Sequence, residues 1–150
     1  MTGSELKTIR EGLGLSADWM AERLGVSLRS YRYWEASDEA IKQDACDLIV
    51  KLDNAVDDAV EAAMAVVESA NMERVVLIRY KSEEDLWRFR KDMVGLPLSI
   101  HNAMLYRLRK KVVSKGIACI VKWLLAKEYL SWLSGAEDTE SMRAAWATSD

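Results

Sequence analysis

One short segment, LRSYRYWEAS at residues 28–37, combines arginine, tyrosine and serine side chains. An arginine near the start of a helix can bond bidentately to O6 and N7 of guanine, a contact that distinguishes base pairs. If Val26, Tyr31 and Trp34 face inward and lock this helix to the preceding one, other positions of the helix face outward. The side chains left outward are Leu28, Arg29, Arg32 and Tyr33. This spacing predicts readout of DNA bases, with Arg29 as the principal contact.

The elements that must position these side chains form a helix-turn-helix between Ser16 and Glu35. Ser16 is a good N-cap for a helix that continues through ADWMAERL, and Gly25 ends it because glycine adopts the left-handed conformation without steric cost. Only Val26 separates that glycine from Ser27, which caps the next helix. So brief a connection makes the two helices cross steeply. The N-terminal half of the second helix can then enter the DNA major groove.

Three serines are candidate contacts to the DNA backbone: Ser16, Ser27 and Ser30. Helix N-termini present free N–H groups and a positive dipole end, which suit phosphate oxygens. Capping alone also explains Ser27. A plain helical hairpin, in which Gly25 and Trp34 serve only packing, is the alternative interpretation, but it gives no reason for the outward arginines.

The stretch LSADWMAERLGVSLRSYRYWEAS resembles the XRE family of Cro- and lambda-repressor-like helix-turn-helix regulators. In that family an alanine, a glycine four residues later and a closing Trp-Glu recur, and here these are Ala21, Gly25, Trp34 and Glu35. The resemblance covers about residues 4–36. The order of this motif, an acidic helix and a small mixed C-terminal unit is more narrowly similar to the YdiL-like regulators, which include phage anti-CRISPR-associated (Aca) repressors.

The narrower resemblance implies a protein of phage or bacterial origin that represses its own operon. It would act as a homodimer on an inverted repeat in its own promoter. Carried onto this chain, the base-reading arginine of those regulators matches Arg29 and the structural tryptophan matches Trp34.

The charge of the chain is distributed unevenly along its 150 residues. A net charge of −3 at pH 7 would by itself argue against a nucleic-acid partner, whose phosphates attract lysine and arginine. Residues 74–123, however, carry 12 basic and 4 acidic side chains, whereas residues 41–73 carry 2 and 8. Any positive field is therefore local, and an acidic remainder limits non-specific DNA binding.

The rest of the chain predicts one long helix followed by a mixed unit. Residues 43–71 form an acidic amphipathic helix, and the β-branched runs at 75–80 and 117–123 read as strands. Between the strands, helices begin after Ser82 and at Pro97. Residues 124–133 fit either a helix or a continuing strand.

We therefore predict a mainly α fold with a small β component. Residues 1–42 form the helix-turn-helix DNA-binding domain, and residues 43–135 form the long linking helix and a small α+β dimerisation domain. Residues 136–150 are expected to be a polar, mobile tail apart from a possible helical turn.

A homodimer is expected because one recognition helix covers only a few base pairs. The apolar stripe on residues 45–67 and the edges of the two strands could build a self-complementary interface across residues 44–133. Two copies would then bind a palindromic operator in double-stranded DNA.

Basic side chains crowd the C-terminal half of the helix expected at residues 98–115: Arg107, Arg109, Lys110 and Lys111. The simpler interpretation is a solvated face, partly paired with the acidic helix. The other is contact with a nucleic-acid backbone, either DNA flanking the operator or RNA, with aromatic side chains such as Tyr106 available for stacking.

Enzymatic function is not expected. His101 is the only histidine, and Cys46 and Cys119 lack metal-ligand spacing, so we expect no catalytic residue, no metal and no cofactor. No apolar run reaches the roughly 20 residues of a membrane span, and the N-terminus lacks a signal-peptide pattern. We expect a cytoplasmic protein with no membrane partner.

The function that these observations favour is a sequence-specific, autoregulatory transcriptional repressor that binds an inverted repeat as a homodimer. One alternative is an antitoxin-like DNA-binding module whose C-terminal part binds a partner protein. The other is a regulator that also binds RNA. Sequence alone does not separate repression from activation.

Overall fold

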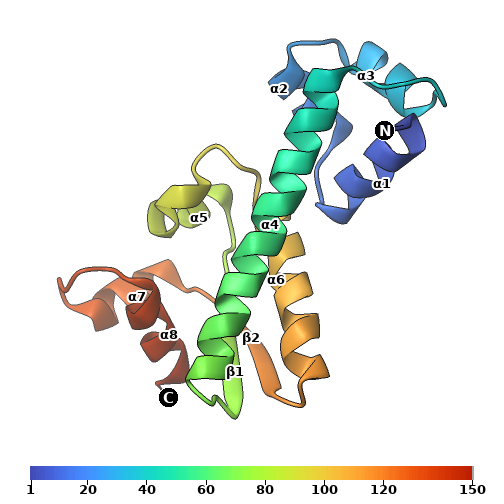
Figure 1. Cartoon of the computed structure of the whole chain (residues 1–150). Helices are drawn as coiled ribbons and strands as arrows, with labels where there is room; N and C mark the ends of the chain where they lie inside the picture. Colours follow the sequence, from blue (N-terminus) through green and yellow to red (C-terminus); the bar gives the residue numbers. More distant parts are fainter. Residues whose placement is uncertain (150) are drawn as a thin grey trace. The chain divides into compact units, whose positions relative to one another are not determined.

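The computed structural model describes residues 1–149 and divides into two compact units, residues 1–61 and residues 62 onward. The fold is mainly helical with one small two-stranded sheet, which confirms the predicted fold class (Figure 1). The division falls inside helix α4 (Gln43–Ser69), whereas sequence patterns place a boundary at residue 42. A single unbroken helix thus contributes residues to both units.

The first unit contains α1 (Gly3–Gly12), α2 (Ala17–Leu24), α3 (Leu28–Glu35) and the start of α4. A capping box begins α1: the Thr2 hydroxyl accepts from the Glu5 N–H, and the Thr2 N–H donates to the Glu5 carboxylate at 2.7 Å. The core of this unit contains fully buried side chains from α1, α2, α3, α4 and the loop after α1. They include Leu6, Leu13, Met20, Tyr31 and Ile49.

Gly3 lets the start of α1 approach the end of α3 closely. Its N–H donates to the Ser37 carbonyl at 3.1 Å. A Cβ atom at this position would meet the carbonyl oxygens of Trp34 at 2.1 Å and Ser37 at 2.4 Å, which are backbone atoms that cannot swing aside. Only glycine therefore fits here without moving α1 away from α3.

The second unit is built around a parallel pair of strands, β1 (Arg74–Arg79) and β2 (Ala118–Trp123). Their register runs from Arg74 opposite Ala118 to Arg79 opposite Trp123, and both strands agree with the sequence prediction to within one residue. The connection between them consists of α5 (Glu83–Phe89), the 3₁₀ turn η1 (Lys91–Met93) and α6 (Leu98–Ser114). Parallel strands need a crossover of this length because no tight hairpin can join them.

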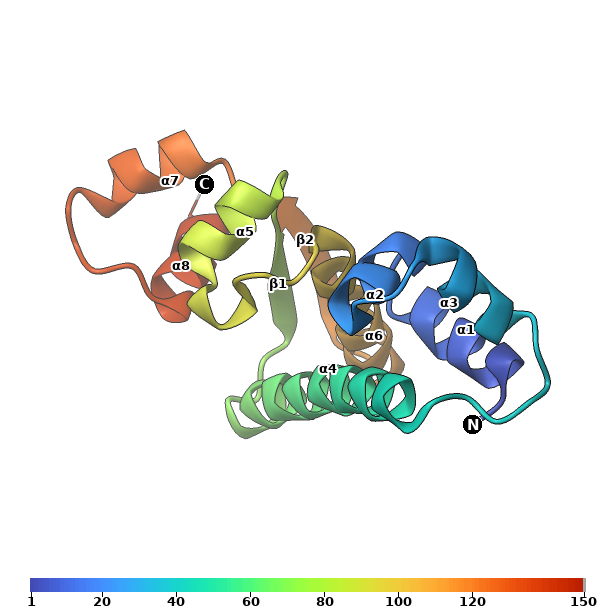
Figure 2. The same ribbon diagram turned by 90° about the horizontal axis from the view of Figure 1, so that it is seen from above.

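Two helices flank the sheet of this unit (Figure 2). Lys122 donates from Nζ to the Ala147 carbonyl of α8 (Glu140–Thr148) at 2.7 Å, so the even-numbered side chains of β2 face α8. Cys119 lies on the other face, where burial raises the pKa of its thiol and the Arg109 charge of α6 partly opposes that shift. α8 therefore lies on one face of the sheet and α6 on the other, and together they leave side chains of β2 partly exposed.

Aromatic rings fill the core of the second unit. The ring of Tyr129, in α7 (Ala126–Leu133), lies 5.6 Å from the ring of Phe89 and 5.7 Å from that of Trp146, both edge-on. Tyr80 stacks on Phe89 at 6.3 Å and meets His101 edge-on at 5.1 Å. The segment at 124–133, which sequence leaves as either helix or strand, is therefore a helix that brings one ring into this cluster.

The expectation of a polar, mobile tail at residues 136–150 requires correction. Thr139 caps α8, in which Arg143 and Ala147 are buried. The Arg143 guanidinium donates to Asp138 at 2.5 Å, and the Tyr129 hydroxyl donates to the other oxygen of that carboxylate at 2.6 Å. Polar residues of this segment thus satisfy one another against the core, which composition does not reveal. Asp150 lies outside the described residues.

Gly3→Ala tests the close approach of α1 and α3. We expect the free energy of unfolding to fall by about 1–3 kcal/mol, because the added methyl group overlaps backbone oxygens. Gly12→Ala in the same helix is the matched control, since a Cβ there meets nothing within 4 Å. That variant should be neutral or slightly stabilising. Chemical denaturation monitored by circular dichroism measures both, and equal stabilities of the two variants would contradict the account.

His101 predicts a pH dependence of stability. Its side chain is 2% exposed, its Nδ1 has no hydrogen-bond partner among the described residues, and burial lowers its pKa from 6.5 to about 4. The unfolded chain therefore binds a proton at a higher pH than the folded chain does. The free energy of unfolding should fall as the pH drops from about 6.5 to about 4. Denaturation of His101→Gln across that window should give a shallower slope, and parallel curves would contradict this assignment.

Candidate nucleic-acid interface

The turn between α2 and α3 has the geometry that the sequence predicts. Gly25 is left-handed, with φ 65° and ψ 33°. Its N–H donates to the Glu22 carbonyl at 3.1 Å, and the Val26 N–H donates to the Ala21 carbonyl at 3.0 Å. This pair of bonds is the Schellman arrangement, which satisfies the last carbonyls of a helix and turns the chain sharply. Ser27 then starts α3 by accepting from the Ser30 N–H at 3.1 Å.

The inner face of α3 packs on α1 and α2 through aromatic side chains. Tyr31 is fully buried, and its ring meets that of Trp34 edge-on at 6.0 Å. Burial raises the pKa of Tyr31 well above its ordinary value, so the side chain stays neutral at physiological pH. Ala21 of α2 is also buried and keeps the two helices close. The alanine and tryptophan of the motif thus serve helix packing, and the glycine serves the left-handed turn.

The outer face of α3 carries the side chains that sequence assigns to base readout. Arg29, Arg32 and Tyr33 are exposed, with Tyr33 at 67%, and Leu28 is half-buried. The three serines assigned to the backbone are exposed as well. Ser16 accepts from the Trp19 N–H at 3.0 Å, and the Ser27 and Ser30 hydroxyls lie 2.9 Å apart. Each serine therefore already has a capping partner while part of its surface faces solvent.

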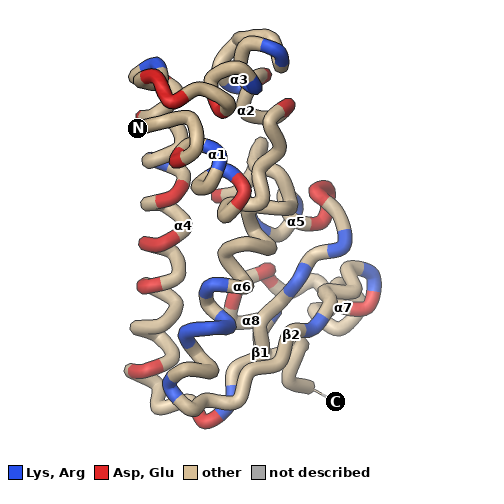
Figure 3. Tube along the Cα trace, turned by 90° about the vertical axis from the view of Figure 1, so that its right-hand side faces the viewer, with Lys and Arg blue, Asp and Glu red and all other residues tan. Residues whose placement is uncertain are grey.

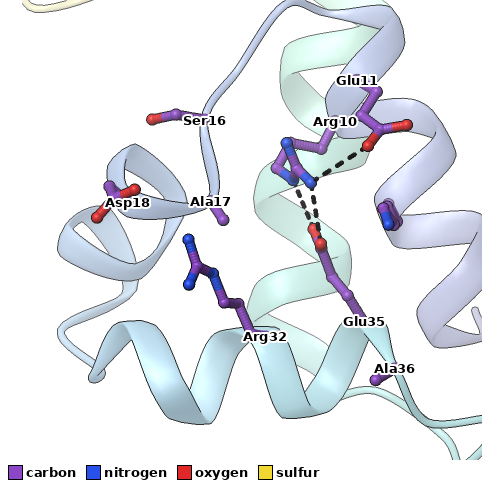
Figure 4. Close-up of a pocket in the computed structure, with 9 residues that line it drawn as sticks. Arg10, Glu11, Ser16, Ala17, Asp18, Arg32, Glu35 and Ala36 are labelled. Carbon is purple, nitrogen blue, oxygen red and sulfur yellow. Dashed lines mark hydrogen bonds and ion pairs between the residues drawn. The ribbon is translucent and has the colours of Figure 1, made fainter.

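A buried ion pair fixes α3 to α1. Arg10 donates to both oxygens of Glu35, from Nε at 2.5 Å and from a terminal nitrogen at 2.9 Å (Figure 4). Its remaining terminal nitrogen donates to the Leu15 carbonyl at 2.7 Å. The two side chains are only 10% and 7% exposed. The hydrogen bonds to Glu35 raise the pKa of Arg10, so the guanidinium remains charged. Because the contact is bidentate, it restrains the rotation of α3 about its axis as well as its distance from α1.

Sequence reasoning does not predict this pair. Arg10 occupies a position on the same face of α1 as Leu6 and Leu13, both fully buried. An arginine at an apolar position of an amphipathic helix is a signal for a buried partner, because an unpaired buried charge is very costly. The partner itself is 25 residues away in the sequence and emerges only from the fold.

Arg32 borders an open hollow between α1, α2 and α3. Figure 4 shows its side chain extending toward Ala17 and Asp18 at the N-terminus of α2. Lys7 and Ser16 line the same hollow. The structure therefore brings together Arg32, predicted to read bases, and Ser16, predicted to contact the backbone. Lys7 joins them, and sequence reasoning does not single it out.

The basic side chains of α6 belong to the second unit. Figure 3 shows acidic positions recurring along α4 and basic positions gathered on α6. Arg109 and Lys110 are exposed, and the Lys110 ammonium lies 5.8 Å from the Tyr106 ring centre. Arg107 and Lys111 each have an interaction within the chain, and Lys115 pairs with Glu68 at 3.6 Å. Some of these basic side chains therefore already interact with other residues of the same chain.

Residues 1–149 offer neither a metal-binding cluster nor a membrane-spanning helix. No group of three or more His, Cys, Asp or Glu side chains is arranged to hold a metal ion. No helix is both long and apolar enough to cross a membrane. The chain matches no known family model and no curated protein.

Glu35→Gln tests the buried ion pair. We expect the free energy of unfolding to fall by about 3–5 kcal/mol, because the change leaves the Arg10 charge buried without its counter-ion. The double variant Arg10→Met/Glu35→Leu should recover much of that loss, since it removes both charges. Glu11→Gln is the control: this carboxylate lies 3.7 Å from the same guanidinium but is 58% exposed, so its loss should cost less than about 0.5 kcal/mol. Similar losses for Glu35→Gln and Glu11→Gln in denaturant melts would contradict the assigned role.

Proposed function

We propose that this chain is a sequence-specific DNA-binding transcriptional repressor that binds an inverted repeat as a homodimer. The observation that carries the proposal is that α3 is packed firmly on one face and exposed on the other. Its inner face is locked by Tyr31, Trp34 and the Arg10–Glu35 pair, while its outer face is exposed and carries arginine and tyrosine side chains. A recognition helix needs this combination, because base readout requires protruding donors held at a fixed orientation.

Arg29 is the side chain best suited to read a base. It lies in the first turn of α3, is exposed, and follows the Ser27 cap by two residues. Residues in the first turns of a recognition helix approach base edges most closely. Tyr33 lies one turn further along α3, where its ring can contact a thymine methyl group or the sugar-phosphate backbone. Leu28 can add an apolar contact at the rim of the groove.

The hollow that contains Ser16, Lys7 and Arg32 suits a phosphate of the DNA backbone. Lys7, Arg10 and Arg32 line the hollow together with the carboxylates of Glu11, Asp18 and Glu35, of which Glu35 pairs with Arg10. The exposed Arg32 and the positive end of the α2 dipole are the features that favour a phosphate there. The position of Arg32 beside this hollow supports a backbone contact in addition to the base readout that the sequence predicts for it. A backbone contact on α2 and a base contact on α3 would together fix the register of the unit on DNA.

Homodimerisation and autoregulation complete the proposal. A single unit reads only a few base pairs, and two copies on a palindrome supply the missing specificity. The resemblance of residues 4–36 to Cro- and lambda-repressor-like regulators supports repression of a promoter that the operator overlaps. The apolar stripe of α4 is not available as the dimer contact, because Ala45, Ile49, Val56, Val60 and Val67 are already buried within one chain.

Arg29→Ala tests base readout on a duplex taken from immediately upstream of the chain's own coding sequence. We expect specific binding to weaken by about tenfold to 100-fold, since a bidentate arginine–guanine contact is worth roughly 1–3 kcal/mol. Competition mobility-shift titrations at fixed salt measure the effect against random-sequence DNA, and the non-specific affinity should change much less.

Arg88→Ala is the matched control. Arg88 is exposed and lies in the second unit, and its replacement by alanine removes the same unit of charge as Arg29→Ala. Its specific affinity should stay close to that of the wild type. Equal losses in the two variants would indicate a general charge effect and would contradict the role of Arg29 as a base reader.

A further inference from the structure

The outer edge of β2 has unpaired backbone groups. The Ala118 N–H donates to the Glu73 carbonyl at 3.2 Å and the Leu124 N–H donates to the Arg79 carbonyl at 2.8 Å. Because backbone groups alternate in direction along a strand, the even-numbered residues of β2 bond to β1. The N–H and C=O groups of Cys119, Val121 and Trp123 therefore point away from β1. In the sheet that residues 1–149 form, no third strand pairs with this edge.

The side chains of β2 are also uncovered, which is unusual for a parallel sheet. Ile120 is 36% exposed, Val121 39% and Trp123 49%, whereas Val75 and Leu77 of β1 are buried. Parallel strands are normally covered on both faces, and a sheet of two strands is marginal in water. The chain thus buries side chains of β1 and leaves side chains of β2 exposed to solvent.

The edge has one of the features that protect natural edge strands from pairing, a lysine, and lacks the others. Such strands commonly have an outward charge, a proline or a bulge. The described part of β2 has no proline, and its register with β1 is continuous over six residues. Its one charge, Lys122, reaches inward to the Ala147 carbonyl of α8. The large exposed side chains of β2, Ile120, Val121 and Trp123, are apolar, and the Arg79 guanidinium lies 5.2 Å from the ring centre of Trp123.

We propose that β2 pairs with β2 of a second copy of this chain, antiparallel across a two-fold axis, to form a four-stranded sheet with the order β1-β2-β2-β1. This proposal deepens the proposed function by naming the dimer interface. Only the purpose of the dimer, which is to bind an inverted repeat, rests on the proposed function. The interface itself is argued from the backbone and side chains of β2.

Symmetry selects a second copy over an unrelated strand. A two-fold axis perpendicular to the sheet places the same face of both copies on the same side of the joined sheet. Odd-numbered residues of β2 are therefore opposite odd-numbered residues of the second copy, and even-numbered residues are opposite even-numbered ones. Centring the axis on Val121 places Cys119 opposite Trp123 and Ile120 opposite Lys122. All three outward backbone positions then find partners, and no like charges meet. Centring it on Lys122 would oppose two lysines, which is unfavourable. With the axis on Val121 each Lys122 lies diagonal to its copy, and its ammonium is bound to the Ala147 carbonyl of its own chain.

Val121→Pro and Val121→Lys test the interface in the full-length chain. Proline removes an N–H that points away from β1, so it leaves the ladder inside each copy intact. Lysine at an exposed position is tolerated by a single copy but brings like charges close to the axis. We expect each variant to raise the dimer dissociation constant about tenfold or more, measured by sedimentation equilibrium, with the lysine effect shrinking at high salt.

Val94→Lys is the matched control, because Val94 is 58% exposed and lies between η1 and α6, away from the strands. It should dimerise as the wild type does. Unchanged circular dichroism and melting of the Val121 variants would establish that they fold, and Val121→Lys remains a test if the proline variant does not.

The outcomes separate this inference from the proposed function. A wild type that stays monomeric up to about 100 µM, or a folded Val121→Lys variant that dimerises normally, overturns the interface whatever happens on DNA. Loss of the dimer in the variants, together with a wild type that fails to bind DNA specifically, would support the interface and overturn the repressor.

Discussion

The orientation of α3 depends on one buried contact, the bidentate ion pair between Arg10 and Glu35. Two charges in a nearly dry environment are stable only when geometry and hydrogen bonding are both close to ideal. Here the guanidinium also donates to the Leu15 carbonyl, so its donors are shared between Glu35 and the loop that leads into α2. The Arg10 side chain thus joins α1 to α3 and to the loop that leads into α2, which restrains the orientation of the exposed face of α3.

The two units divide the proposed work. The first holds α3 through Gly3, the ion pair and the aromatic lock, which leaves Arg29 and Tyr33 exposed. The second is a small parallel sheet with a complete strand and an open one. Val121 and Trp123 are apolar and exposed in the isolated chain. The proposed pairing of β2 with a second copy gives these side chains a role in the interface. Specific readout by a short helix and assembly through a sheet edge are then two parts of one design.

Local signals predicted much of the fold from sequence. The Ser16 and Ser27 caps and the Gly25 turn depend on neighbouring residues only, and the structure confirms each of them. Long-range contacts were harder. The Arg10–Glu35 pair spans 25 residues. The polar composition of residues 136–150 predicts a mobile tail, because sequence does not show that Arg143 and Tyr129 both donate to Asp138 and hold α8 in place. The apolar stripe of α4 was visible, but a pattern shows that a face is buried without showing which partner covers it.

The most direct measurement of the central claim is selection of bound duplexes from a random DNA pool by the full-length protein, repeated at two salt concentrations. The account predicts an inverted repeat with half-sites about one helical turn apart, because two α3 helices related by a two-fold axis must enter successive major grooves on one side of the duplex. It also predicts affinity that falls with salt in proportion to the number of phosphate contacts. Recovery of no common sequence, or of a single asymmetric site bound by one copy, would contradict it.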